Sequence, residues 1–451
     1  MFNRAKPASC GHLQHILLLA MCAACAGTAH AASGPLTLDG AVSLAIESDP
    51  WLGGSREIES ALRDEAVAAA SLPDPRIDLR AVNLPLPSLD LSEVPMTQIA
   101  VGVSQQFPRG RTRSLARQQK EALAAAEPMR RADRKAKLTA TVAGLYLDAW
   151  LASASRILIE QDRALFEQLV DAAESQYTTA VGRARQQDLI RAQLELTRLD
   201  DRLTVLRQHQ DAAQERLSEF VGAAAGSTLP AELPTLEPAS TPLVGSADAS
   251  PEALFAAMRQ HPAVLASERQ IDSMTTGVAL ARQKYRPAWG VSAQYGYRAD
   301  NAQGQSQSDL LSVGITLDVP LFRANRQDRE VSAAVAREAA AWSEHDLLVR
   351  QLVASLQTAR AEFDRLNERR RLYDRRLLPQ MSQQAEASLA AYNNADGDFA
   401  EAVRARIAEL DTKIDALGIE VARLQALARL NYLLARGPTT DAAGNRAGDH
   451  S

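Results

Sequence analysis

The sequence predicts a mainly α-helical chain with a small β part, built as two structural repeats of long antiparallel coiled-coil helices and four strands in all. The first observation is a duplicated motif: residues 101–108 and 313–320 both read Val-Gly-(Val/Ile)-(Ser/Thr), three further residues and Pro. The second is that three pairs of prolines share the offset of this motif, 212 residues: Pro50 and Pro262, Pro75 and Pro287, and Pro108 and Pro320. The third is a hydrophobic period that changes in each repeat from about 3.6 residues to 2, and then to about 3.5. Because Pro fixes φ, the shared prolines mark equivalent backbone positions in two copies of one unit.

Composition sets the broad limits. The chain has 451 residues, of which 46% are hydrophobic and 4% aromatic, and its formal net charge is −5 with both signs interspersed. This is enough chain for two or more ordinary domains. A nucleic-acid-binding protein would need a basic face, and none is visible, so we expect no nucleic-acid partner.

Residues 1–31 are typical of a secretory signal peptide. Arg4 and Lys6 give a basic start, an apolar run covers residues 16–26, and Ala29-His30-Ala31 is an A-x-A-type cleavage site. All three cysteines, Cys10, Cys22 and Cys25, lie in this leader, so the mature chain is expected to have no disulfide and no thiolate metal site. An alternative is that Cys25 becomes a lipidated first residue.

The first repeat is expected over residues 32–222 and the second over 250–436. A linker rich in Pro, Ser, Thr and Ala (223–249) joins them, and a disordered tail (437–451) follows. Each repeat opens with a short helix that ends before Asp49-Pro50 or His261-Pro262. A further helix then covers about 55–71 or 263–284, and Pro73 or Pro287 ends it.

Strict alternation then predicts two strands in each repeat, at about 76–83 and 98–108, and at about 289–298 and 311–322. In the last strand Val313, Ile315 and Leu317 face one way, while Gly314, Thr316 and Asp318 face the other. Polar or Pro-containing loops at about 84–97 and 299–309 would join each pair into a hairpin.

Two long rods follow, from about 111 to 181 and from about 325 to 396. Some 70 helical residues would span on the order of 100 Å, far more than a globular helix. Pro128 and Pro379 are expected to kink these rods or to divide them. The rods turn at tips, about 178–182 and 393–398, and return as helices whose apolar residues alternate in steps of three and four, as in an antiparallel coiled coil.

Isolated hairpins with one apolar face are not stable in water. Short strands that are apolar on one face and polar on the other are what a transmembrane β-barrel uses. Four strands cannot close a barrel, because small barrels have about eight, so we expect the chain to oligomerise into a conduit. The periodicity alone leaves open a periplasmic coiled-coil protein whose strands form an ordinary small β domain.

With the repeats laid out, the chain resembles the TolC family of outer-membrane efflux channels over nearly the whole mature sequence. The stretches 72–75 (LPDP), 83–85 (NLP), 96–97 (MT) and 101–110 (VGVSQQFPRG) resemble the heavy-metal branch of that family, the CzcC/CusC type. The resemblance implies a homotrimer with a twelve-stranded barrel in the outer membrane and a helical tube in the periplasm. It also implies a periplasmic adaptor and an inner-membrane pump of the resistance-nodulation-division (RND) type as partners.

In this interpretation the chain is a passive exit duct for heavy-metal cations. The alternatives are a channel for drugs or other small molecules, and a periplasmic coiled-coil adaptor or scaffold. An adaptor normally carries one helical hairpin and a lipoyl-type β domain, whereas this sequence predicts two hairpins and no such domain.

The candidate site residues lie at the tips and in the strands. Asp396 and Asp398 flank Gly397, where three copies of a carboxylate would attract cations; turn and capping chemistry explains them equally well. Asp188 and Glu401 are further gate candidates, with a solvated helix face as the alternative. Four residues are expected to shape the tips: Tyr177, Gly182, Tyr392 and Gly397. The resemblance implies adaptor docking there, and plain turn and packing roles explain these residues equally well. Arg80, Arg298 and Asp318 are expected in the barrel lumen. Phe107, Trp289 and Phe322 are expected at the membrane interface, with a packed aromatic as the alternative.

Nothing in the sequence predicts catalysis. His209, His261 and His345 are isolated, and no nucleophile motif, phosphate loop or Rossmann glycine pattern is present. We therefore expect no enzyme activity, no cofactor and no stored metal.

Overall fold

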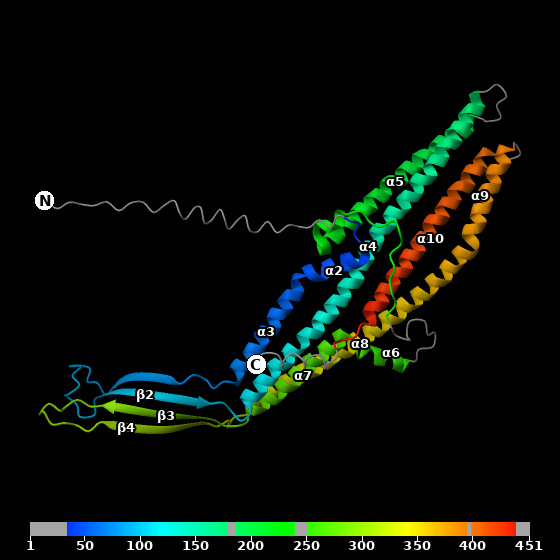
Figure 1. Cartoon of the computed structure of the whole chain (residues 1–451). Coiled ribbons are helices and arrows are strands. Elements are labelled where there is room, and N and C mark those ends of the chain that lie inside the picture. Colours follow the sequence, from blue (N-terminus) through cyan, green and yellow to red (C-terminus); the bar gives the residue numbers. More distant parts are fainter. Residues whose placement is uncertain (1–33, 179–185, 240–250, 395–397, 439–451) are drawn as a thin grey trace, which may run out of the picture.

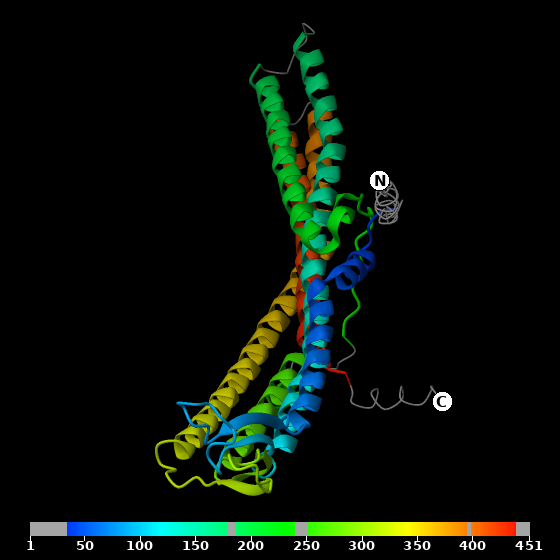
Figure 2. The ribbon, with the colours of Figure 1, turned by 90° about the vertical axis from the view of Figure 1, so that its left-hand side faces the viewer.

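The computed structural model describes residues 34–178, 186–239, 251–394 and 398–438. The predicted signal peptide, most of the first tip and half of the second lie outside the described residues, as does nearly all of the predicted tail. The described chain is long: a flat sheet lies at one end, and two helical hairpins extend away from it (Figure 1). A view turned by 90° shows that both hairpins reach towards the same distant end (Figure 2).

The elements follow the expected order twice. The first repeat contains α2 (Leu38–Ser48), α3 (Pro50–Ala70), β1 (Arg76–Val82), β2 (Gln98–Phe107), α4 (Thr112–Thr178), α5 (Gln186–Val221) and a 3-10 turn (Gly222–Gly226). The second contains α6 (Pro251–Met258), α7 (Pro262–Gln283), β3 (Ala288–Tyr297), β4 (Leu310–Asp318), α8 (Gln327–Leu372), a π turn (Tyr373–Leu377), α9 (Leu378–Asn393) and α10 (Phe399–Leu433).

The four strands form one antiparallel sheet in the order β1-β2-β3-β4. The two repeats meet in its centre, where Phe107 of β2 lies opposite Trp289 of β3. The helices keep the same order as the strands, because α3 packs on α4, α4 on α7, and α7 on α8. The strands β1, β2, β3 and β4 are therefore continued by α3, α4, α7 and α8, in that order.

The core is a series of clusters along the helices. Tyr146, Leu147 and Leu217 are fully buried where α2 crosses the bundle. The Tyr146 hydroxyl donates to the carbonyl oxygen of Leu36 at 2.8 Å, and burial raises the pKa of Tyr146 to about 12. Other clusters surround Met258 and Leu356 in the second repeat, and Phe166 and Leu410 nearer the tips. The buried contacts are therefore spread along the helices, as in a coiled coil, and do not form one central core.

Residues 227–239, within the predicted linker, lie against the bundle. The Trp150 indole N–H donates to the carbonyl oxygen of Pro230 at 3.0 Å. The side-chain oxygen of Asn431 accepts a hydrogen bond from the backbone N–H of Ala239 at 2.8 Å. Its side-chain nitrogen donates to the carbonyl oxygen of Glu237 at 2.8 Å. The segment thereby satisfies its backbone groups on the helices that it crosses.

The two rod prolines have different effects. α4 continues through Pro128 without a break. In the second repeat the helix ends at Leu372, a π turn follows, and Pro379 lies in the first turn of α9, where its missing N–H costs least. The prediction of a division is confirmed for Pro379 only.

One stretch within α4, Thr112–Gln168, is long and apolar enough to cross a membrane by length and composition, and half of its most apolar window is buried inside the protein. Because α4 packs on α3, α5, α7 and α10, we assign this stretch to the core of the helical bundle.

Candidate membrane-facing sheet and duct surface

One face of the sheet is almost entirely apolar and exposed. On β1 and β2 the side chains of Ile77, Leu79, Ile99, Val101 and Val103 are exposed, and on β4 those of Leu311, Val313, Ile315 and Leu317. Ile77 and Ile315 each keep 78% of their surface accessible. The register brings all of these residues to the same face. A contiguous apolar patch of this kind is rare on a soluble monomer and indicates contact with lipid or protein.

Aromatic residues mark both ends of this apolar face. At the helix end the rings of Phe107 and Trp289 stack, with centroids 4.1 Å apart and planes inclined by 14°. At the loop end Tyr295 and Tyr297 are exposed. Tyr297 follows Trp289 by eight positions in β3, or about 27 Å at the rise of an antiparallel strand. Transmembrane barrels have an apolar band about 25 Å tall between two aromatic girdles, so the dimensions fit a bilayer.

The opposite face carries small and polar residues. Asp78 and Arg80 of β1 form a salt bridge at 3.0 Å on this face. A Cβ at Gly102 would come within 2.6 Å of the Asp78 carboxylate, so glycine leaves room for that side chain to lie across β2. Arg80 and Asp318 both lie on this polar face, the face that we expect to line a lumen.

Both edges of the described sheet are unpaired. β1 bonds only to β2, and β4 only to β3, so one backbone row of each outer strand has no strand partner among the described residues. Exposed edges are a liability that proteins cover or pair. The sheet is therefore incomplete as a single chain.

Arg298 lies one residue beyond the end of β3, between the two hairpin loops. Its guanidinium donates to the carbonyl oxygens of Pro95 at 2.5 Å and Ser308 at 3.3 Å, and also to Gln307. Its backbone N–H donates to Asp309 at 3.0 Å. Arg298 thus joins the loops at the outer end of the sheet, a role that the sequence did not indicate.

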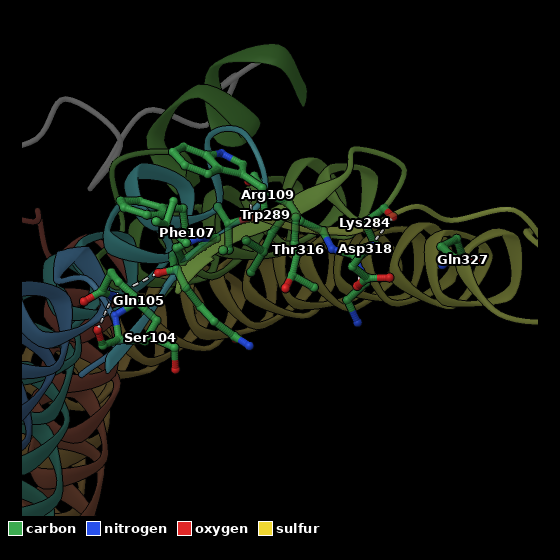
Figure 3. A pocket seen from close by; sticks show the side chains of 18 of the residues that line it. Ser104, Gln105, Phe107, Arg109, Lys284, Trp289, Thr316, Asp318 and Gln327 are labelled. Atoms are coloured by element: carbon green, nitrogen blue, oxygen red, sulfur yellow. Dashed lines mark hydrogen bonds and ion pairs between the residues drawn. The ribbon is translucent and has the colours of Figure 1, made fainter. Parts of the chain in front are cut away.

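The junction of sheet and helices contains a cavity of about 700 Å³ (Figure 3). Arg109 forms an ion pair with Asp318 and also donates to the carbonyl oxygen of Lys284 at 2.7 Å. The Lys284 ammonium lies 3.0 Å from the Glu330 carboxylate. These contacts fix the ends of β2, β4 and α7 to one another where the sheet meets the helices.

Sequence reasoning missed Arg109 and Lys284 as junction residues. The glycine directly after Arg109 was a local signal in the sequence. In the structure Gly110 has φ +47°, and a Cβ there would clash with the side chains of Gln283 and Arg286. The Phe107 and Trp289 side chains project together beside this junction, and their rings stack (Figure 3).

The tips are described only in part. Gly182, Asp396 and Gly397 lie outside the described residues, and so do the side chains of Tyr177 and Asp188. Asp398 is exposed and caps α10, since its carboxylate accepts the N–H of Ala400 at 3.2 Å. Glu401 is exposed in the first turn of the same helix. The Tyr392 ring packs edge-on against Phe399 at 5.2 Å, so Tyr392 closes the apolar end of the hairpin.

Within the described ranges, no group of three or more His, Cys, Asp or Glu side chains is arranged to hold a metal ion. At the junction, Asp318 and Glu330 are paired with basic side chains, and Asp328 accepts a hydrogen bond from the Tyr285 hydroxyl.

A four-stranded sheet with one bilayer-sized apolar face, open edges and a long coiled-coil continuation defines the TolC-like fold of outer-membrane channels. No family model matches the chain, and no curated protein matches it. Solved structures do. The chain is similar to CusC, with 15% identity, a TM-score of 0.72, and coverage of 89% of this chain and 93% of that one.

Two further channels show the same likeness. The outer-membrane channel CmeC of Campylobacter jejuni has 10% identity and a TM-score of 0.73, with 90% of this chain and 88% of that one covered. The outer-membrane protein VceC of Vibrio cholerae has 15% identity and a TM-score of 0.70, with 89% and 96% covered. These likenesses confirm the predicted fold class for a single chain.

Proposed function

We propose that this chain is one third of a homotrimeric outer-membrane channel, the passive exit duct of a tripartite efflux system. The observation that carries the proposal is the sheet itself. One face is apolar and exposed, the other is polar, and the backbone groups at both edges lack a strand partner among the described residues. Three copies would supply twelve strands, joined edge to edge between β4 of one copy and β1 of the next, which removes every open edge.

The helices support the same assembly. Because α3, α4, α7 and α8 follow the order of the strands, closing the barrel also closes a ring of helices beneath it. The polar face with Asp78, Arg80 and Asp318 then lines the lumen, and the tips of the hairpins form the mouth far from the membrane.

The remaining parts of the system are other proteins. A duct of this kind moves its cargo down a gradient, so energy must come from an inner-membrane pump of the RND type, reached through a periplasmic adaptor at the tips. The chain itself is proposed to be no enzyme and to need no cofactor. Its contribution is a shaped and charged passage.

The proposed cargo is heavy-metal cations. Support comes from the sequence resemblance around residues 72–110 and from the presence of CusC among the similar structures. The fold does not choose this cargo, because CmeC and VceC match at nearly the same TM-score. Growth of a deletion strain across metal salts and drugs decides the matter. We expect sensitivity to metal salts alone, and sensitivity to drugs alone would favour a multidrug channel.

Membrane fractionation tests the duct itself. We expect the protein in the outer-membrane fraction, released only by detergent, and forming discrete conductance steps in a planar bilayer. Recovery from the periplasm as a soluble protein would contradict the proposal and favour a coiled-coil adaptor or scaffold.

A further inference from the structure

The two ends of the sheet have opposite charge. Three segments at the helix end, residues 109–113, 282–286 and 318–330, contain nine Arg and Lys and three Asp and Glu. The two loops at the other end, residues 83–97 and 298–309, contain one Arg and four Asp and Glu. The basic end is unusual in a chain whose net charge is −5.

Within the described ranges, most of these cations have no acidic partner, although Arg113 donates to the carbonyl oxygen of Ala70 and Arg323 to that of Pro320. Among the described residues only Arg109 and Lys284 of the nine form salt bridges. The other seven are exposed: Arg111, Arg113, Arg282, Arg286, Arg323, Arg326 and Arg329. Helix stability does not explain them all, because Arg111 and Arg113 lie at the N-terminus of α4, where the helix dipole disfavours a cation and the first turn has no acidic residue.

The order of residues along the chain is the same at three passages through this junction. Moving away from the apolar strands, an aromatic residue comes first and an arginine next: Phe107 and Arg109, Trp289 and Arg286, Phe322 and Arg323. The Phe322 side chain is 90% exposed. An apolar band, then aromatic rings, then cations is the profile of a membrane interface, where rings lie at the headgroup level and arginines reach the phosphates.

We propose that the sheet–helix junction is a basic collar that binds the phosphate headgroups of anionic phospholipids in the leaflet on the helical side. This inference rests on the proposed function, since it requires the apolar face to lie in a bilayer. Arginine suits the task because its guanidinium is always charged and binds phosphate oxygens in bidentate fashion. The acidic loops at the opposite end would repel the same lipids, so the collar also fixes the orientation and depth of the channel.

The test uses the full-length trimer, reconstituted in vesicles of phosphatidylcholine with or without phosphatidylglycerol, with native mass spectrometry to measure the lipid retained. The collar variant combines Arg111→Gln, Arg286→Gln and Arg329→Gln. The matched control combines Arg371→Gln, Arg375→Gln and Arg376→Gln, three exposed arginines that have no salt bridge among the described residues and lie far along the helical rod.

We expect the wild type and the control to prefer phosphatidylglycerol. The collar variant should lose at least about tenfold of that preference, since each basic residue near a membrane surface contributes roughly fivefold. Added salt should weaken the wild-type preference. Channel conductance is measured in the same vesicles, so that the duct is tested separately.

Three results would overturn the collar. The first is a conducting channel with no lipid preference, which leaves the proposed duct intact. The second is an unchanged lipid preference with altered ion selectivity, which would place these charges in the lumen. The third is displacement of the lipid by inorganic phosphate but not by chloride at equal ionic strength, which would assign the site to free phosphate. Failure of the wild type to enter any vesicle would contradict the proposed function, and the collar with it.

Discussion

Asp49 and His261 occupy equivalent positions in the two repeats and cap α3 and α7 with different chemistry. The Asp49 carboxylate accepts the N–H of Trp51 at 3.3 Å and is held by Arg134 at 2.9 Å, and the hydrogen bond from Arg134 lowers the pKa of Asp49. His261 is fully buried, and its Nδ1 accepts the N–H of Ala263 at 3.2 Å. Its Nε2 must then carry the proton and donate to the carbonyl oxygen of Tyr432 at 3.2 Å.

Replacing His261 should destabilise the junction of α7 with the end of α10. His261→Ala leaves the Ala263 N–H and the Tyr432 carbonyl oxygen without partners in a buried site, which costs about 1–3 kcal/mol. Thermal melting followed by circular dichroism measures the loss. His209→Ala on the exposed face of α5 is the control and should melt like the wild type. Equal melting of both variants would show that the cap contributes nothing.

His261 should also make stability depend on pH. Burial lowers its pKa, although the nearby Asp133 carboxylate and the bond to Tyr432 oppose the shift. As the pH drops, His261 therefore takes up a proton more readily in the unfolded chain than in the folded chain. The free energy of unfolding falls as the pH drops below about 6.5. His261→Asn keeps a capping oxygen but does not titrate, so melting temperatures between pH 7 and pH 5 should fall less for this variant than for the wild type. A steeper fall in the variant would contradict this account.

At the scale of the elements, α3 is fixed to α4 by a buried polar cluster. Arg131 donates to Glu59 at 2.5 Å and lies 3.3 Å from the Ser55 hydroxyl, which itself donates to Glu127 at 2.7 Å. The side chain of Glu59 is 9% exposed and that of Arg131 is 18% exposed. This cluster lies beside Pro128, where α4 loses one backbone hydrogen bond but stays continuous.

Breaking this pair on one side should be costly. Arg131→Leu leaves the buried Glu59 with only the largely exposed Arg63 as a cationic partner, and should destabilise the protein by about 2 kcal/mol. The double variant Arg131→Leu with Glu59→Leu should recover much of that loss, as denaturant titration would show. Arg365→Leu removes one partner of an exposed pair and should cost less than about 1 kcal/mol. A double variant as unstable as the single one would mean that the cluster acts as a unit beyond this pair.

At the second tip, substitutions can distinguish the effect of the carboxylate charges from the helix-capping role of Asp398. Asp398→Asn keeps the side-chain oxygen that caps α10, so Asp396→Asn with Asp398→Asn removes charge but not the cap. If these carboxylates attract cations at the mouth, the double variant should lose cation preference in a planar bilayer. Asp398→Ala alone should instead destabilise the start of α10 by about 1 kcal/mol. Unchanged selectivity in the double variant would remove both residues from the gate.

The strands and long helices could be predicted because each rests on a local period, and Val313, Ile315 and Leu317 lie on one face as alternation requires. The roles of Arg298 and of residues 227–239 could not, because both depend on partners far away in the sequence, such as Pro95 and Asn431. The apolar period predicts the start of α3 at about residue 55, whereas the helix begins at Pro50. Asp49 caps the helix and Pro50 occupies its first turn, and the apolar period does not contain this capping signal.

At the scale of the whole molecule, the duplication provides both the strands and the helices for one third of the closed wall that we propose. The repeats meet at β2 and β3, so each chain presents β1 at one edge and β4 at the other. Such edges are complementary between copies, and a rotation that closes gives a ring. The central claim is that this ring forms within the membrane.

Disulfide trapping in isolated outer membranes tests this claim most directly. The three cysteines of the sequence all lie in residues 1–31, the predicted leader, so cysteines introduced on the edges are expected to have no competing thiol in the mature chain. Leu79→Cys on β1 is combined in turn with Leu311→Cys, Val313→Cys or Ile315→Cys on β4, which lie on the same apolar face as Leu79, because the register between copies is to be found. We predict dimer and trimer bands for at least one pair, since β1 and β4 of one chain lie at opposite edges and cannot meet. Monomer alone for every pair, in protein that is present in the membrane, would contradict the account.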